Sequence, residues 1–482
     1  MEFFKSHIWQ IALGLNYVIA ISAVITIIFK RINPSKTLSY IIALLVIPFL
    51  GILVYYLFGQ EYRKSKIFNR KKILNQSIVK SIQENTNVSD SLYENIEDRL
   101  KEKSKLIPLV YNSENSKLTT NNALEIIKDG DKKFELLFED IKNAKHHIHL
   151  EYFIVKDDGI GSQLLDLLAQ KSKDGLDVKL ILDDVGSDVS KKTISKLESN
   201  GVKVNVFMPV LFSKYTGKMN YRDHRKIAII DGEIGYVGGI NVSDNYINSN
   251  ETNYFRDTHC RIKGEAVKQL QILFFTTWDF VTQEDVKIEE AYFPAIDNYG
   301  TIPIQISASG PDTDWSNIME AIFMAITNAS DYIYITTPYF IPNDEIVTAL
   351  QVAARSNISV KMLIPKVSDS WVAENATNSY VERLLEAGVE VYAYTKGFIH
   401  AKTMIVDDIF SSIGTANMDY RSFNINFEVN ALVYDEKVAE KLKTLFFDDL
   451  KTSEKLELDS WKNRGKRQKA LEALANLMAP LL

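Results

Sequence analysis

Two histidines of this chain are followed by the same four residue types at the same four distances. A lysine comes two positions later, an aspartate seven, a glycine fourteen and an asparagine seventeen. The first copy comprises His224, Lys226, Asp231, Gly238 and Asn241, and the second His400, Lys402, Asp407, Gly414 and Asn417. Because the chain has only seven histidines, this repetition is difficult to attribute to chance. The spacing predicts one site that is assembled from two half-sites.

The side chains that recur suit the transfer of a phosphodiester group. The lysines supply positive charge, and Asn241 and Asn417 supply neutral donors, for the negative charge that develops as phosphorus is attacked. A neutral imidazole can attack phosphorus while a protonated imidazole opposite donates to the leaving oxygen. One histidine cannot hold both roles at once, which accounts for a pair. No cysteine or carboxylate cluster accompanies the motifs, so we expect neither a metal nor a cofactor.

Two acidic residues are candidates for holding the imidazoles in one tautomer. A catalytic histidine usually has a carboxylate on its other ring nitrogen. Asp257 lies 33 residues after His224 and Glu428 lies 28 after His400, each in a segment that we expect to form a further strand. We therefore predict that Asp257 and Glu428 orient the histidines. The alternative is that Asp257 only pairs with a neighbouring arginine.

The aspartates of the two motifs are candidate site residues because of their place in the motif, but their place at a turn also suggests a structural role. Asp231 begins an Asp-Gly turn signal that follows the apolar run 227–230, as expected where a strand enters a hairpin. On such a strand, residues two apart, such as His224 and Lys226, emerge on one face. We expect Asp231 and Asp407 to stabilise the backbone of their turns rather than to take part in the chemistry.

The remaining histidines of the first half have weaker claims to function. His146, His147 and His149 look like a metal cluster, but they straddle the start of a predicted strand, where neighbouring side chains face opposite ways. We expect no metal there. His259 lies two residues after Asp257, and a buried structural role is favoured for it over a supporting role at the site.

The repeat extends upstream of each histidine as an alternation of short β-branched runs and longer helical patterns. This alternation is typical of βαβ units around a parallel sheet. We predict an α/β fold of two tandem domains with mixed, largely parallel sheets flanked by helices. The first domain is expected at 106–285 and the second at 286–482, ending in an amphipathic helix that suits either a lipid interface or packing against its own domain.

The N-terminal part of the chain is apolar. Residues 8–29 and 38–58 carry no charge, and at about 1.5 Å per residue each is long enough to cross a hydrocarbon core of roughly 30 Å. We predict a two-helix transmembrane hairpin within residues 1–60, in preference to a signal peptide or a buried core hairpin. A basic then polar linker, 61–105, follows. Its positive charges predict a multi-pass protein of the cell membrane with catalytic domains in the cytoplasm.

Composition excludes some functions. The net charge of −6 is mild, whereas a nuclease draws its affinity from basic residues, so we expect no nucleic-acid partner. The single cysteine, Cys260, excludes an intramolecular disulfide.

The two motifs, each of the form HxKxxxxD, resemble those of the phospholipase D superfamily. The wider context is similar to that of bacterial cardiolipin synthases, in stretches that include residues 254–259, 336–342 and 397–422, and the similarity covers nearly the whole chain. The resemblance implies a phosphatidyl-histidine intermediate, with His224 as nucleophile and His400 as acid and base. It also implies that phosphatidylglycerol is both donor and acceptor, that glycerol leaves and that no cofactor is consumed.

Other functions are compatible with the motifs, because the first half-reaction is shared and only the acceptor differs. The alternatives are a lipid hydrolase, another phosphatidyltransferase, a nuclease, and a non-catalytic scaffold that binds lipid. The apolar N-terminus favours lipid over nucleic acid, and the full-length resemblance favours a synthase. The completeness of both motifs disfavours the scaffold.

Overall fold

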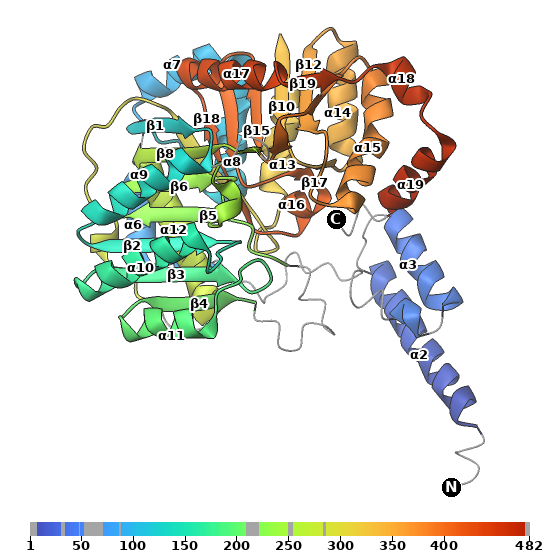
Figure 1. Ribbon diagram of the computed structural model, residues 1–482, viewed down its shortest axis with the longest axis horizontal. Helices are drawn as coiled ribbons and strands as arrows, with labels where there is room; N and C mark the ends of the chain where they lie inside the picture. The colour runs from blue at the N-terminus through green and yellow to red at the C-terminus, as the bar shows by residue number, and fades with distance from the viewer. Residues whose placement is uncertain are drawn as a thin grey trace. The chain divides into compact units, whose positions relative to one another are not determined.

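The computed structural model describes most of the chain, namely residues 7–29, 34–47, 49–52, 71–85, 88–208, 221–248, 254–282 and 286–477. The chain forms two compact units (Figure 1), which are Met1–Tyr62 with Met208–Tyr221, and Arg63–Phe207 with Arg222–Leu482. The second unit contains both repeated motifs.

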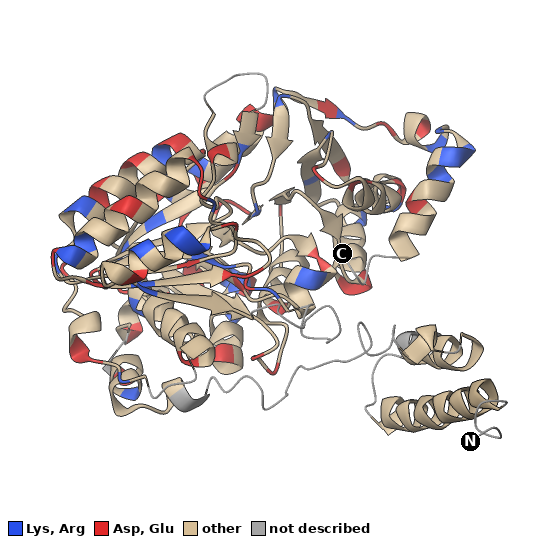
Figure 2. Ribbon diagram, turned by 60° about the horizontal axis from the view of Figure 1, so that its bottom comes forward, with Lys and Arg blue, Asp and Glu red and all other residues tan. Residues whose placement is uncertain are grey.

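The N-terminal unit contains two helices that pack against each other. Helix α2 is Ile8–Phe29 and helix α3 is Pro34–Val46. The apolar side chains buried in this unit are Ala20, Ala23, Ile27 and Leu44, and the polar side chain of Asn16 is buried as well. Helix α2 has no charged residue (Figure 2), and among the described residues it is the one helix long and apolar enough to cross a membrane, by length and composition alone.

The second predicted span, 38–58, is described only in part. It begins within α3 and continues into residues 53–70, which lie outside the described residues. Arg63, Lys64, Lys66 and Arg70, four of the six basic residues that follow this span at 63–72, lie in the same stretch. The two-helix membrane hairpin and the cytoplasmic orientation therefore stay predictions.

The first sheet carries the first motif. In chain order its strands are β1 (Asn122–Ile127), β2 (His147–Tyr152), β3 (Asp177–Asp183), β4 (Lys203–Phe207), β5 (Lys226–Ile230), β6 (Ile234–Gly238) and β8 (His259–Gly264). They are arranged in the order β1-β8-β6-β5-β2-β3-β4. The predicted hairpin at Asp231 is confirmed: β5 and β6 are antiparallel, Ile230 pairs with Ile234, and Asp231 and Gly232 have φ of 54° and 71°.

The second sheet repeats this topology. Its strands are β9 (Ile304–Ser309), β10 (Tyr332–Thr336), β12 (Ser359–Pro365), β13 (Glu390–Tyr394), β15 (Thr403–Val406), β16 (Phe410–Gly414), β18 (Glu428–Val433) and β19 (Ser453–Lys455). Read from the opposite edge, the order β9-β18-β16-β15-β10-β12-β13 matches the first sheet strand for strand, and β19 is added beyond β13. The duplication predicted from the motifs is therefore present in the fold.

The sheets are mixed, as predicted, but the prediction that they are largely parallel is wrong. Parallel pairing within them is confined to β2-β3-β4 and β10-β12-β13. The other neighbouring strands, including the hairpin of each motif, are antiparallel. Parallel neighbours need a crossover connection, whereas a hairpin returns directly. The βαβ pattern extends only up to the motif. The two strands of each motif's hairpin are joined by a direct reversal of the chain, and they are therefore antiparallel.

Helices cover both faces of each sheet (Figure 1). On the first sheet, one face is covered by α9 (Gly130–Asn143), α10 (Gly159–Lys173) and α11 (Lys191–Ser199), and the other by α12 (Ala266–Thr282). On the second, one face is covered by α13 (Asn317–Thr327), α14 (Asp344–Arg355) and α15 (Trp371–Glu386), and the other by α17 (Glu436–Leu450). Several of these helices begin with an aspartate or serine that caps the first turn, such as Asp158 at α10 and Ser370 at α15.

The two halves are joined at several places. Strands β6 and β8 contact β16 and β18. Strand β7 (Tyr254–Arg256) pairs in parallel with β14 (Gly397–Ile399), which belongs to the other half. This contact brings the segments that surround the two motifs together.

The segment before the first sheet packs into the core of the second half. Helix α7 is Asp90–Leu100 and helix α8 is Leu106–Glu114, and their apolar residues, such as Ile96 and Val110, lie in the same core as Ile318 of α13. Residues 90–105 fall within the predicted linker and residues 106–114 within the predicted first domain, and the apolar side chains of both share a core with the second half. The apolar residues of this segment recur at helical spacing among many polar ones, so overall composition conceals a buried face.

The C-terminal helix α19, Lys466–Leu477, packs against α15. Its buried residues are Glu472 and Ala475, whereas Leu474 and Leu477 are 60% and 78% exposed. The helix therefore packs against its own domain through the side opposite Leu474 and Leu477.

Candidate active site

Each motif histidine stands just before a central strand of its own half and is fixed by backbone from the other half. His400 follows β14, and its N–H donates to the carbonyl of Arg256 at 2.7 Å. An equivalent parallel bridge joins Asp223 to Phe427, where the N–H of His224 donates to the carbonyl of Phe427 at 2.9 Å. The same main-chain contact thus occurs twice, related by the duplication.

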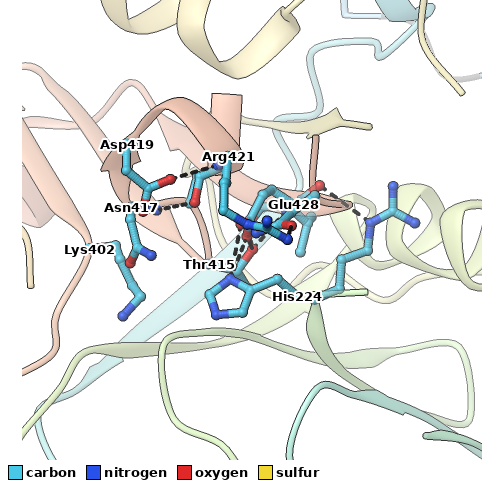
Figure 3. A network of polar contacts seen from close by, with 12 residues as sticks. His224, Lys402, Thr415, Asn417, Asp419, Arg421 and Glu428 are labelled. Atoms are coloured by element: carbon cyan, nitrogen blue, oxygen red, sulfur yellow. Dashed lines mark hydrogen bonds and ion pairs between the residues drawn. The ribbon is translucent and has the colours of Figure 1, made fainter. Parts of the chain in front are cut away.

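The residue after each of these carbonyls is the carboxylate that holds the histidine. Asp257 Oδ2 lies 2.7 Å from His400 Nδ1. Glu428 Oε1 and Oε2 lie 2.9 and 3.0 Å from His224 Nδ1 (Figure 3). Both predicted acids contact a motif histidine, but crosswise, because each acid comes from the half opposite its histidine. With Nδ1 committed to a carboxylate, Nε2 is the ring nitrogen available to a substrate.

The neighbouring arginine binds elsewhere. Arg256 Nε donates to both carboxylate oxygens of Asp449 at 3.0 and 3.1 Å. The other oxygen of Asp257, Oδ1, accepts the N–H of Thr258 at 2.7 Å. The alternative explanation of Asp257, an ion pair with a neighbouring arginine, does not describe the contacts of this carboxylate.

The two lysines lie beside their histidines and are fully buried. Lys226 Nζ donates to the carbonyl of His224 at 2.7 Å, and Lys402 Nζ donates to that of His400. Burial lowers the pKa of Lys226 to about 7 and that of Lys402 to about 8. Burial also lowers the pKa of His400 to about 4 and that of His224 well below its ordinary value. An anionic phosphodiester favours the charged form of each group, so the site is suited to a negatively charged substrate.

One cavity of about 460 Å³ is lined by both histidines and by residues of both halves. Asn241 and Asn417, the residues predicted to contact a phosphate, line it as well, but their surroundings differ. Asn241 Oδ1 accepts the N–H of Ile154 at 3.1 Å, and its Nδ2 donates to the hydroxyl of Tyr246 at 2.6 Å. Asn417 Oδ1 is buried and has no hydrogen-bond partner in the described part of the chain.

The motif aspartates lie at the far ends of β5 and β15 from the histidines. The carboxylate of Asp231 accepts three backbone N–H groups, from residues 145 to 147, at 2.8 to 3.0 Å. That of Asp407 accepts three from residues 330 to 332, at 2.6 to 2.8 Å, and Lys103 Nζ at 2.6 Å. Both aspartates have positive φ in their turns. The contacts are structural in kind, as expected, but they fix the start of the neighbouring strand rather than the turn itself.

The other histidines contact protein groups. His147 Nε2 lies 3.0 Å from Gln271 Oε1, and Gln271 Nε2 donates to His149 Nδ1 at 2.9 Å; burial lowers the pKa of both rings. Within the described residues, no group of three or more histidine, cysteine or acidic side chains could hold a metal ion. His259 Nδ1 accepts the N–H of Ile240 at 3.4 Å, which supports the backbone next to Asn241.

Some functional residues escaped the sequence analysis. Thr415 Oγ1 donates to Glu428 Oε2 at 2.5 Å. The equivalent position of the first half is Gly239, where a Cβ atom would lie 2.0 Å from Asp257 Oδ1. The 176-residue offset between the motifs relates Gly239 to Thr415, so extending the alignment beyond the histidines would have drawn attention to both.

The arrangement can perform a double displacement at phosphorus. One imidazole can attack while the other donates a proton to the leaving oxygen, and the roles of acid and base then alternate. The duplicated fold and the paired histidine and lysine residues define an enzyme of the phospholipase D class.

Known proteins place the chain within that class. The family described as "Cardiolipin synthase, PLD-like domain" matches residues 137–278 and 322–450, and the one described as "Phospholipase_D-nuclease N-terminal" matches residues 18–60. Cardiolipin synthase 2 of Staphylococcus epidermidis is 40% identical over 95% of each chain. Cardiolipin synthase 2 of Bacillus anthracis is 39% identical over 95% of this chain and 88% of its own. The chain therefore belongs to the cardiolipin synthase family of phosphatidyltransferases.

A solved structure shares the fold. The crystal structure of phosphatidylserine synthase from Haemophilus influenzae matches with a TM-score of 0.59 and 14% sequence identity, over 79% of this chain and 98% of that chain. The similarity of fold extends beyond the site to both halves.

Proposed function

We propose that the protein is a membrane-bound cardiolipin synthase, which transfers a phosphatidyl group between two molecules of phosphatidylglycerol and releases glycerol. The observation that carries the proposal is the pair of histidines, each fixed by a carboxylate of the opposite half and both lining one cavity. The names of the similar proteins from Staphylococcus epidermidis and Bacillus anthracis, both cardiolipin synthase 2, support a phospholipid as the substrate.

In the first half-reaction, His224 Nε2 attacks the phosphorus of the donor lipid. The N–P bond forms as the bond from phosphorus to the headgroup glycerol oxygen breaks, and His400 gives a proton to that oxygen. Lys226 and Lys402 stabilise the charge on the phosphoryl oxygens. Asn241 and Asn417, which line the cavity, contribute neutral donors. Glycerol leaves and phosphatidyl-histidine remains.

In the second half-reaction, a headgroup hydroxyl of a second phosphatidylglycerol attacks the same phosphorus. His400, now neutral, accepts the hydroxyl proton, a new P–O bond forms, and the bond to His224 breaks. One phosphodiester replaces another, so the cycle needs no cofactor, and both histidines return to their starting states.

The difference between the two acids supports His224 as the nucleophile. Burial raises the pKa of Glu428 to about 7, so near neutral pH much of this acid is uncharged and does little to favour a protonated His224. Asp257, at 2.7 Å, raises the pKa of His400 against the opposing effect of burial. A neutral imidazole attacks and a protonated one donates, which matches His224 and His400 in that order.

The N-terminal unit is proposed to anchor the enzyme in the cell membrane. Helix α2 has the length and composition of a membrane span. The predicted second span would make the protein multi-pass, with the catalytic domains in the cytoplasm, where the donor and acceptor lipids are reached from the inner leaflet. A reporter fused after residue 72 tests the orientation, because activity only outside the cell would contradict it.

The reaction is tested with purified full-length protein and vesicles of phosphatidylglycerol. We expect equimolar cardiolipin and glycerol. Phosphatidic acid as the main product would identify a hydrolase and contradict the synthase. Degradation of DNA without lipid turnover would identify a nuclease.

A further inference from the structure

The cavity is lined by two arginines that have no arginine at the equivalent positions of the other half. Arg222 and Arg421 both line the cavity. The offset of 176 residues that relates His224 to His400 places Phe398 and Asn245 at the equivalent positions of the other half. The duplication therefore retained the histidines and lysines twice but has an arginine pair only on one side.

The bridge between the halves brings these arginines to the same wall. Arg222 lies two residues before His224, and its carbonyl accepts the N–H of Phe427 at 2.9 Å. Arg421 is held in the turn that precedes Phe427, where its carbonyl accepts the N–H of Asn426 at 2.8 Å and its Nη2 donates to Asn426 Oδ1 at 3.4 Å. Arg222 also has an anionic neighbour, Asp183, whose Oδ1 lies 3.5 Å from Nη1.

Arg421 extends towards the pair formed by His224 and Glu428 (Figure 3). Its charge is among those that lower the pKa of His224, after burial and the lysines, so it lies within electrostatic reach of the reacting histidine. Arg421 is not part of either repeated motif, unlike the lysines that accompany the histidines. The His224 end of the cavity thus has positive charge beyond the four motif side chains.

The His400 end is aromatic instead. The ring centroids of Tyr246, Phe255 and Phe398 lie 6.1, 5.4 and 5.8 Å from that of His400. The guanidinium pair that can stabilise a second anionic group in the cavity is therefore confined to the arginine end.

The proposed reaction requires such a second anionic group. Cardiolipin contains two phosphodiesters that are joined by one glycerol. The phosphorus of the first is bound to His224 during the cycle, and the second phosphodiester enters with the acceptor lipid. The acceptor phosphate is not transformed, and the three carbons of a glycerol keep it near the first. Guanidinium groups bind phosphate oxygens through paired hydrogen bonds, which suits them to this task.

We propose that Arg222 and Arg421 form a subsite for the phosphate of the acceptor lipid. This inference rests on the proposed function, and it names what makes a phospholipid a better acceptor than glycerol or water. Glycerol carries no phosphate and gains nothing from the subsite. The arginines therefore determine the specificity of the second half-reaction rather than the formation of phosphatidyl-histidine.

The test compares two reactions of the same full-length enzyme in phosphatidylglycerol vesicles. Exchange of labelled glycerol into phosphatidylglycerol needs only the first half-reaction and its reverse, whereas cardiolipin formation needs a second lipid phosphate. We expect Arg222→Gln and Arg421→Gln to lower cardiolipin formation at least ten-fold more than they lower glycerol exchange. The apparent KM for phosphatidylglycerol in cardiolipin formation should rise, and Arg421→Lys should restore part of the loss.

A matched control removes a different cation from the same cavity. Lys156 lines the cavity from the first half and is half-buried. Lys156→Gln should change the ratio of the two reactions by less than two-fold. An equal loss of both reactions in the arginine variants, with unchanged melting temperature, would overturn the subsite, as would a selective loss in Lys156→Gln alone. If the unaltered enzyme catalyses neither reaction, the proposed function itself fails, which is a distinct result.

Discussion

The half-site of His224 and the half-site of His400 have the same backbone but differ in the acid that holds the imidazole. His224 is held by both oxygens of Glu428, whose pKa burial raises to about 7. His400 is held by one oxygen of the shorter Asp257 at 2.7 Å. The duplication thus supplied one geometry twice, and the side chains around it diverged in a way that suits attack at one histidine and proton transfer at the other.

The support behind each acid differs at a single equivalent position. Thr415 donates a hydroxyl to Glu428, whereas Gly239 has no side chain and allows Asp257 to lie against its backbone. A hydroxyl stabilises a buried carboxylate in its charged form, and a glycine makes room for one. The same position therefore tunes one acid and accommodates the other.

The largest effect is expected from removing the histidines themselves. His224→Ala and His400→Ala should each lower cardiolipin formation by about three orders of magnitude or more, because each removes a nucleophile or an acid. With a phosphatidyl ester of p-nitrophenol, which leaves without a proton, His400→Ala should still accumulate phosphatidyl-histidine, and His224→Ala should not. Mass spectrometry locates the intermediate. A phosphatidyl group on His400 would reverse the assignment of the two half-sites.

The next effect concerns the two acids. Asp257→Asn should lower kcat by about 10²-fold, as expected for loss of the charge that favours protonated His400. Glu428→Gln should lower kcat less than Asp257→Asn does below pH 7, because Glu428 is largely protonated there and is already neutral like glutamine. Above pH 7 the carboxylate of Glu428 is ionised. If its charge contributes to catalysis, the kcat of the wild-type enzyme rises as the pH increases through about 7, and the kcat of Glu428→Gln does not. Equal pH profiles for both enzymes would remove the distinction between the acids.

A smaller effect is expected at the position where the halves diverge. Gly239→Ala should lower kcat about ten-fold or more, because a Cβ atom 2.0 Å from Asp257 Oδ1 displaces the acid from His400. Thr415→Val should lower kcat less, since it removes one hydrogen bond, worth about 1 to 3 kcal/mol when a charged group is involved, and should shift the limb near pH 7 upwards. A Thr415→Val enzyme with the wild-type pH profile would contradict this role of the hydroxyl.

The smallest effect on catalysis is expected from the motif aspartates. Asp231→Asn and Asp407→Asn weaken contacts to three backbone N–H groups at the end of the strand remote from the histidine. Melting temperature should fall in both while kcat per folded enzyme changes by less than about three-fold. The fall should be larger for Asp407, which also loses its ion pair with the buried Lys103. A drop in kcat comparable to that of Asp257→Asn would place these aspartates in the chemistry.

Much of the fold followed from local patterns. The β-branched runs and the Asp-Gly turn predict the strands and hairpin of the first motif, because alternation and turn chemistry depend on neighbouring residues. The local patterns did not predict that most neighbouring strands are antiparallel, because the order of strands in a sheet is decided by packing rather than by spacing along the chain. The same reason hid the position of Ile96, which lies in one core with Ile318 of α13, more than two hundred residues later.

The sequence by itself singled out the side chains that we propose do the chemistry, because His224, Lys226, His400 and Lys402 repeat at fixed intervals that a strand presents on one face. It also identified Asp257 and Glu428 as acids without pairing them to histidines. Only the tertiary structure decided that each acid contacts the histidine of the other half, because the residue before each acid pairs with the residue before that histidine. That pairing makes the two half-sites interdependent, so neither half contains a supported histidine without the other.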